Sequence, residues 1–186
     1  KLFNVLDFSI PLHVACWAVF LIAIFLMARK SNIVPPSLSA FDITKHLSRG
    51  DIFLGKAGLL VYFKWSKTIQ CGERKLVIPL VKLPSSKLCP VKAYLNLLSI
   101  VKANPQDPAF TFKVKPKMEC VTQYSFVKTL RTAINKLGLS GHLFSGAQFQ
   151  MRWCHHCLLS SSARRVNSNT RRLGVRRLFK VFRSRF

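Results

Sequence analysis

The sequence predicts an α+β fold that is mainly helical and carries one small antiparallel β-sheet. Three observations support this class: an unbroken apolar run near the N-terminus, two neighbouring stretches rich in β-forming residues, and two later segments with apolar residues at helical spacing. With 186 residues, 49% of them hydrophobic, the chain is long enough for one domain with a sizeable core.

The first predicted element is a long buried helix. Val14 to Ala28 are fifteen consecutive apolar residues, Pro11 suits the first turn, and Arg29-Lys30 would give the helix a cationic C-terminal end. A membrane segment is the alternative for this run. Fifteen helical residues span about 22 Å, which is shorter than the bilayer's apolar core of about 30 Å. The length therefore favours a core helix.

A β-hairpin is predicted after the irregular segment 37–50. Residues 59–65 and 75–80 are rich in β-branched and aromatic side chains. The polar stretch 66–74 between them contains Gly72 and several cations. These features predict two antiparallel strands joined by a basic tip.

Two amphipathic helices are predicted in the second half of the chain. The first begins at Pro90, and its apolar stripe consists of Val91, Tyr94, Leu95, Leu98 and Val101. The second begins at a Thr122 cap and ends at Gly138. Its apolar face carries Phe126, Leu130, Ile134 and Leu137. Between the two helices, residues 109–114 form a candidate short strand.

The formal net charge of +24 points to a polyanionic partner. Residues 1–146 carry 20 Lys and Arg against 6 Asp and Glu, and residues 147–186 carry 10 against 0. Nucleic acid is the expected partner; an anionic membrane surface, or solubility alone, is the alternative use of such a charge. The six cysteines show no regular spacing, which predicts reduced thiols in an intracellular protein.

Three motifs in order resemble the catalytic domain of tyrosine recombinases, most closely the eukaryotic DIRS-type transposon recombinases. They are Leu26-Met27-Ala28-Arg29-Lys30-Ser31-Asn32, Phe63-Lys64-Trp65-Ser66-Lys67-Thr68 and Leu88-Cys89-Pro90-Val91-Lys92-Ala93-Tyr94. The likeness covers about residues 8–146. It implies a partial, truncated catalytic domain over residues 1–146, and it implies that the function by descent is site-specific DNA recombination and integration of a mobile element.

In this family a tyrosine cuts one DNA strand and forms a phosphotyrosyl link without a metal or cofactor. The resemblance implies that Arg29 is the first phosphate-binding arginine, since a planar guanidinium can grip two phosphate oxygens. It implies that Lys67 is the general acid for the departing 5′ oxygen, with Lys64 as its rival. A cation at a helix end and a solvated lysine are the alternatives for Arg29 and Lys67. The residues expected to contact DNA are Lys30, Lys64, Arg74 and Lys75.

The second half of the family's active site is missing from this sequence. After Leu143-Phe144-Ser145-Gly146 the family pattern continues with His-Ser-Phe-Arg-Arg-Gly-Gly-Ala-Thr and ends with the nucleophilic tyrosine. This chain has no His-x-x-Arg beyond that point, and its last tyrosine is Tyr124. The expected consequence is a copy that does not cleave DNA, because covalent catalysis needs its nucleophile.

A shift of reading frame accounts for the departure. Residues 147–157 can be back-translated so that reading one base downstream gives His-Ser-Phe-Arg-stop-Gly-Gly-Ala-Thr-Ile. Residues 172–183, shifted in the same way, give Asp-Trp-Ala-Ser-Asp-Ala-Tyr-Leu-Arg-Tyr-Leu. We therefore predict that 147–186 is an out-of-frame, disordered, Arg-rich tail. The pattern Cys154-His155-His156-Cys157 within it lacks the second ligand pair of a structural zinc site.

The sequence thus predicts an inactive recombinase remnant with residual DNA binding and a nuclear location. Family members act as oligomers on DNA, and no cofactor, metal or membrane is expected. The alternatives are a non-catalytic basic nucleic-acid-binding protein and a membrane-anchored basic protein.

Overall fold

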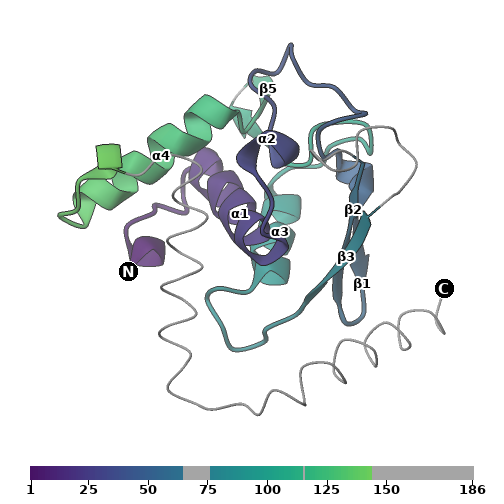
Figure 1. The fold of residues 1–186 in the computed structure, drawn as a ribbon, viewed down its shortest axis with the longest axis horizontal. Helices are drawn as coiled ribbons and strands as arrows, with labels where there is room; N and C mark the ends of the chain where they lie inside the picture. The colour runs from purple at the N-terminus through teal and green to yellow at the C-terminus, as the bar shows by residue number, and fades with distance from the viewer. Residues whose placement is uncertain (65–75, 115, 144–186) are drawn as a thin grey trace. The chain divides into compact units, whose positions relative to one another are not determined.

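The computed structural model describes residues 1–64, 76–114 and 116–143. The chain divides into two units, 1–151 and 152–186, and every described residue belongs to the first. That unit is α+β, with helices and small antiparallel sheets (Figure 1). The helices are α1 (Pro11–Leu26), α2 (Lys30–Ile33), α3 (Pro90–Ile100) and α4 (Gln123–Lys136). The strands are β1 (Ile52–Gly55), β2 (Gly58–Phe63), β3 (Leu76–Val81), β4 (Thr111–Val114) and β5 (Lys117–Cys120).

Helix α1 is the centre of the core. Every residue from Val14 to Ala23 is buried, which explains why this stretch is apolar all round. The helix packs against α3, β3, β4 and α4, and in Figure 1 it lies between α4 and the three-stranded sheet. The predicted core helix is therefore confirmed. Within the described residues no helix is long and apolar enough to span a membrane.

The end of α1 differs from the prediction. The apolar run was expected to continue as one helix into a cationic C-terminal end, but α1 stops at Leu26 and a separate short helix begins at Lys30. Arg29 is consequently the residue that precedes α2, not the last turn of α1.

The predicted hairpin is confirmed as the pair β2–β3, which belongs to a sheet of order β1–β2–β3. Its register pairs Gly58 with Val81 at one end and Phe63 with Leu76 at the other. A Cβ built on Gly58 would lie 2.0 Å from the carbonyl oxygen of Leu80, so only glycine allows this close approach. The basic tip, 65–75, lies outside the described residues. Strand β1 was not predicted, because it has only four residues and two of them, Phe53 and Leu54, are exposed.

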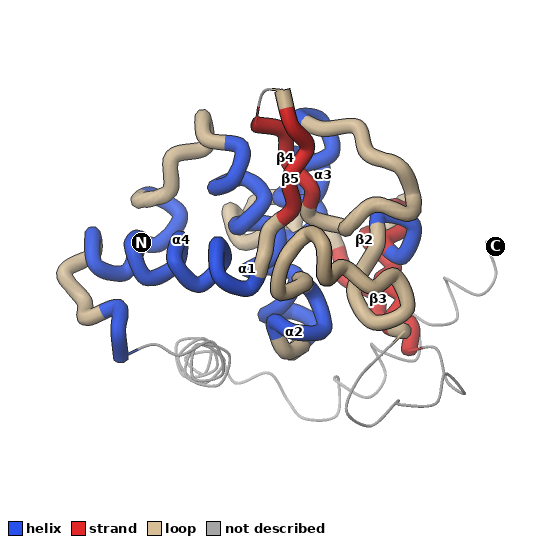
Figure 2. Tube along the Cα trace, turned by 90° about the horizontal axis from the view of Figure 1, so that it is seen from above, coloured by secondary structure: helices blue, strands red, loops and turns tan. Residues whose placement is uncertain are grey.

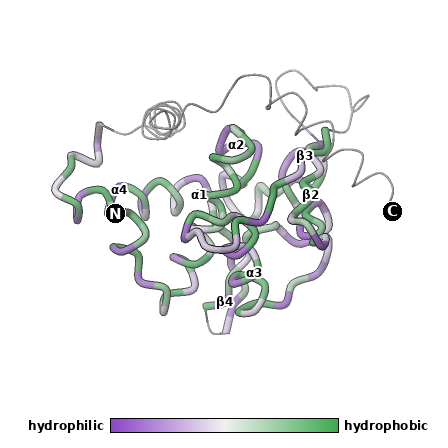
Figure 3. The backbone as a smooth tube through the Cα atoms, turned by 90° about the horizontal axis from the view of Figure 1, so that it is seen from below, coloured by the Kyte–Doolittle hydropathy of each residue, from purple (hydrophilic) through white to green (hydrophobic). Residues whose placement is uncertain are grey.

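The two later helices begin where the sequence predicts. Pro90 opens α3, whose buried side chains are Pro90, Val91, Ala93, Tyr94 and Leu97. The predicted stripe was wrong at Leu95 and Leu98, which are half-buried flanks of this face. Thr122 caps α4 through a reciprocal capping box with Ser125, and Gly138 ends it with a φ of 76°. Figure 3 shows the alternation of hydrophobic and hydrophilic residues along α4.

The candidate strand 109–114 is present as β4, and it pairs with β5, which was not predicted. This two-stranded ribbon packs on α1 and α3 (Figure 2). The loop before β4 is hydrogen-bonded to the turn that precedes β1. Arg49 N–H donates to Asp107 O at 2.8 Å, and Gly50 N–H donates to Pro105 O at 2.8 Å. These bonds hold the short 3₁₀ turn Arg49–Asp51 in place.

Burial of ionisable core groups makes the fold sensitive to alkali. Burial raises the pKa of the Cys16 thiol to about 12, that of Tyr94 to about 12 and that of Cys120 to about 11. Their ordinary pKa values are 9.0 for cysteine and 10.0 for tyrosine. Above those values the unfolded chain loses protons that the folded chain keeps, so stability falls as pH rises from about 9 to 12. We expect the unfolding temperature to drop over this range.

Thermal unfolding between pH 8 and pH 11 checks this expectation. Cys16→Ala removes one of the titrating groups, so its unfolding temperature should fall less steeply with pH than that of the parent chain. Identical slopes for the two chains would contradict the role given to Cys16.

Candidate nucleic-acid interface

The turn between α1 and α2 fixes the position of Arg29. Ala28 N–H donates to Ala23 O at 3.1 Å and Met27 N–H donates to Ile24 O at 3.1 Å, which is the hydrogen-bond pattern of a Schellman motif. Met27 sits in the left-handed region with φ 50° and ψ 31°. Arg29 follows in an extended conformation and is exposed. The cation therefore leaves the core at a sharp, hydrogen-bonded corner.

Met27 occupies a backbone conformation that favours glycine. Its side chain is 72% exposed, so little packing is lost when it is removed. We expect Met27→Gly to raise the free energy of unfolding by about 1 kcal/mol, because the left-handed strain disappears. Met118→Gly is the matched control: Met118 lies in strand β5 without positive φ, and its replacement should lower stability. A lower urea midpoint for Met27→Gly would contradict this account of the turn.

Helix α2 places Lys30 beside Arg29 and is anchored at its far end. Ile33 and Val34 are each 1% exposed. Gln123 then ties this segment to α4, since its backbone N–H donates to Pro35 O at 2.9 Å and its Nε2 donates to Val34 O at 3.3 Å. Within the described chain neither Arg29 nor Lys30 forms an ion pair. Two adjacent cations are thus presented from a fixed support.

Lys64 lies at the end of β2 and is held by the protein itself. Its Nζ is 2.8 Å from Oδ1 of Asp51 and donates to Ile43 O at 3.2 Å. The other carboxylate oxygen of Asp51 accepts from Ser48 N–H at 2.8 Å and from Ser48 Oγ at 2.7 Å. Asp51 is therefore buried and satisfied at both oxygens. Lys64 joins the tip end of the hairpin to the 3₁₀ turn, and a DNA contact would compete with this pair.

Arg49 is a second cation in the same turn, and it is buried. Its Nη2 donates to Thr111 O at 3.3 Å, and its Cζ is 5.9 Å from the centroid of the Tyr94 ring. Nε and Nη1 have no hydrogen-bond partner among the described residues. Arg49 is only 8% exposed, so its side chain packs in the interior and is not part of a surface for DNA.

The structure places only some of the predicted site residues. Arg29 and Lys30 are adjacent at the start of α2, and Lys64 is paired with Asp51. Lys67, Arg74 and Lys75, the predicted boundary at 146/147 and the tail with its Cys154–Cys157 pattern lie outside the described residues. Sequence reasoning missed Asp51, although Ser48-x-x-Asp51 has the spacing of a capping box.

Besides Asp51, three of the five acidic side chains in the described residues accept hydrogen bonds from near neighbours in the sequence. Asp7, Asp42 and Asp107 accept hydrogen bonds from residues within three positions, and Asp42 also pairs with Lys45 at 3.1 Å. Hydrogen bonds from Thr44 hold the pKa of Asp42 at about 2. These carboxylates stay ionised, but the chain has only 6 Asp and Glu against 30 Lys and Arg. The resulting field is positive and attracts polyanions.

The three tyrosines of the chain have different environments. Tyr94 is 1% exposed, and Tyr62 on β2 packs edge to face against Phe53 with ring centroids 5.0 Å apart. Tyr124 is 73% exposed near the start of α4, with Lys128 Nζ 5.9 Å from its ring centroid. Tyr124 is thus the accessible phenol of this chain.

Among the described residues no group of His, Cys, Asp and Glu side chains could hold a metal ion. No protein-family model, curated protein or solved structure matches this chain.

Proposed function

We propose that this chain is a remnant of a tyrosine-recombinase catalytic domain that binds DNA without cleaving it. The observation that carries the proposal is the corner after α1, where Arg29 and Lys30 leave an apolar core side by side and exposed or half-exposed. The supporting motif is the antiparallel pair β2–β3, whose connection contains Lys67.

The chemistry of the corner suits a phosphate. A guanidinium donates two parallel hydrogen bonds to two phosphate oxygens, and an adjacent ammonium adds a point charge. The hydrogen-bonded turn and the burial of Ile33 and Val34 limit the movement of the backbone that carries both cations. Pre-organisation of this kind reduces the entropy lost on binding.

The absence of cleavage follows from the tyrosines. Tyr94 is inside the core, Tyr62 packs on Phe53, and Tyr124 precedes the part of the sequence where the family carries its nucleophile. Without a positioned nucleophile, Arg29 can bind a phosphate but cannot promote strand exchange.

Arg29→Ala is expected to weaken binding to duplex DNA and to lower the slope of log affinity against log salt by about 0.9, because one phosphate contact is lost. The measurement is fluorescence anisotropy of a labelled duplex across a salt series. Lys56→Ala is the matched control, since Lys56 is exposed in the β1–β2 turn, at the end of the sheet opposite the Phe63–Leu76 pair. Equal slopes for Arg29→Ala and the parent chain would contradict the proposed contact.

A further inference from the structure

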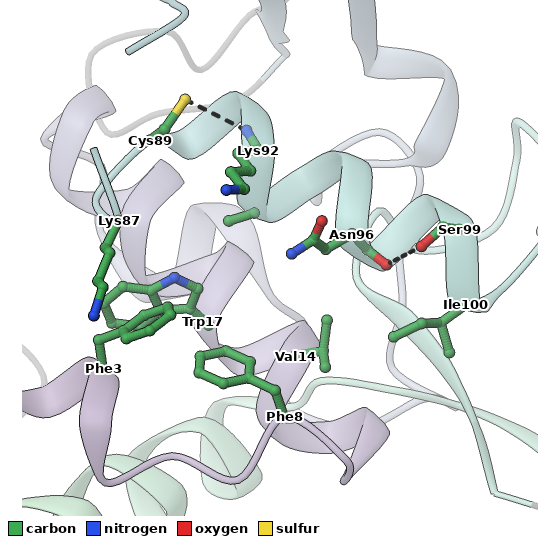
Figure 4. A pocket seen from close by; sticks show the side chains of 11 residues that line it. Phe3, Phe8, Val14, Trp17, Lys87, Cys89, Lys92, Asn96, Ser99 and Ile100 are labelled. Carbon is green, nitrogen blue, oxygen red and sulfur yellow. Dashed lines mark hydrogen bonds between the residues drawn. The ribbon is translucent and has the colours of Figure 1, made fainter. Parts of the chain in front are cut away.

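A cavity of about 260 Å³ lies between the N-terminal segment, the first half of α1 and helix α3 (Figure 4). Its apolar wall is an aromatic cluster of Phe3, Phe8 and Trp17, with ring centroids 4.8 to 6.4 Å apart. Arg29 follows the opposite end of α1, which is about 24 Å long. The cavity is therefore separate from the proposed DNA contact, and a ligand can bind there whether or not the chain binds DNA.

The polar rim of this cavity carries two cationic side chains. Lys87 and Lys92 are exposed at its edge, and Lys87 Nζ is 5.1 Å from the centroid of the Phe3 ring. In Figure 4 the side-chain amide of Asn96 lies on the α3 side, facing the aromatic cluster. No acidic side chain is among the described residues that line the cavity. A ligand that suits this rim is an anion.

The aromatic rings do not offer a stacking platform for nucleic-acid bases. Trp17 is 4% exposed, one of its faces is stacked on Phe20 at 5.4 Å, and Phe3 and Phe8 meet it edge to face. Binding of single strands uses exposed ring faces in a row. This recess has instead the size and apolar wall for one large side chain.

We propose that this cavity binds an acidic peptide segment of a partner protein. An aromatic or large aliphatic side chain enters the recess against Phe3, Phe8 and Trp17, and neighbouring Asp or Glu carboxylates pair with Lys87 and Lys92. The aromatic anchor supplies the buried area and the two lysines select the charge. The binding is reversible and involves no covalent step.

The test uses the full chain with Trp65→Phe and Trp153→Phe, so that Trp17 is the sole tryptophan and can be excited selectively. The probe is the peptide acetyl-Glu-Asp-Phe-Asp-Glu-amide at 0.15 M salt. We expect a saturable change in Trp17 emission. A peptide with alanine in place of phenylalanine, and one with Gln and Asn in place of the acids, should each bind at least about tenfold more weakly, since each loses more than about 1.4 kcal/mol.

Two pairs of variants locate the site. Lys87→Gln with Lys92→Gln should weaken binding about tenfold. Lys56→Gln with Lys82→Gln removes the same charge from exposed lysines outside the cavity and should leave the affinity within about twofold. Asn96→Phe, a change at an exposed helical position, should block the recess and abolish the signal.

Several results would overturn the proposal. They are the absence of a saturable change, equal binding of the alanine peptide, or equal losses in the two lysine pairs, which would indicate attraction by net charge alone. Binding of an oligo-dT strand that competes with the peptide and depends equally on Lys87 and Lys92 would assign the cavity to nucleic acid instead.

Discussion

Asp51→Asn is expected to lower the free energy of unfolding by about 3 kcal/mol, the low end of the range for breaking a buried ion pair. The carboxylate is 6% exposed and accepts from Lys64 Nζ, Ser48 N–H and Ser48 Oγ. An amide of the same shape loses the charge that compensates Lys64. Because Lys64 is partly exposed, its ammonium regains some hydration, which keeps the loss at that lower end.

Asp42→Asn is the matched control for this variant. Asp42 also pairs with a lysine and caps a turn, but its side chain is 37% exposed against 8% for Asp51, so its replacement should change stability far less. Urea unfolding of the two variants gives the comparison. If both shift the midpoint equally, the buried cluster around Asp51 does not hold the tip end of the hairpin.

Lys64→Met separates the pair from the rest of the cluster. This change leaves the buried Asp51 carboxylate without its counter-charge but with its two bonds from Ser48, so we expect a loss similar to that of Asp51→Asn, about 3 kcal/mol. If Lys64 also contacts DNA, Lys64→Met lowers affinity in the same salt titration that tests Arg29. The two readouts therefore distinguish a structural lysine from a DNA-binding one.

The elements with strong local signals could be predicted from sequence. Pro90 marks a helix start through its fixed backbone angle and Thr122 through its side-chain cap, and the apolar run of α1 is long enough to specify a buried helix. The corner after Leu26 could not be predicted, because the left-handed residue there is Met27 rather than glycine. Strands β1 and β5 are each four residues long and carry too little alternation to detect.

The arrangement of the site was less accessible from sequence than the fold. Adjacent residues such as Arg29 and Lys30 remain together in any fold, so their pairing is visible in the sequence. The Asp51–Lys64 pair depends on the register that brings the end of β2 to the 3₁₀ turn. The aromatic cavity joins the N-terminal segment to α3, a contact that only tertiary packing creates.

The largest functional effect expected is a complete loss of covalent DNA cleavage. In the proposed recombinase family the reaction needs a tyrosine beyond the position of residue 146, and the last tyrosine of the given sequence is Tyr124. A missing nucleophile removes the covalent step itself, whatever phosphate contacts remain. A version with the reading frame restored after residue 146, and an arginine codon in place of the stop, should regain the nucleophile.

The most direct measurement is covalent trapping on nicked suicide duplexes cut from the DNA that flanks the coding sequence. The chain as it stands and the restored version are incubated with the same duplexes and resolved on a denaturing gel. We predict a denaturation-resistant protein–DNA adduct from the restored version alone. An adduct from the chain as it stands, lost in Tyr124→Phe, would place a working nucleophile on α4 and contradict the account, and no adduct from either would contradict the recombinase ancestry.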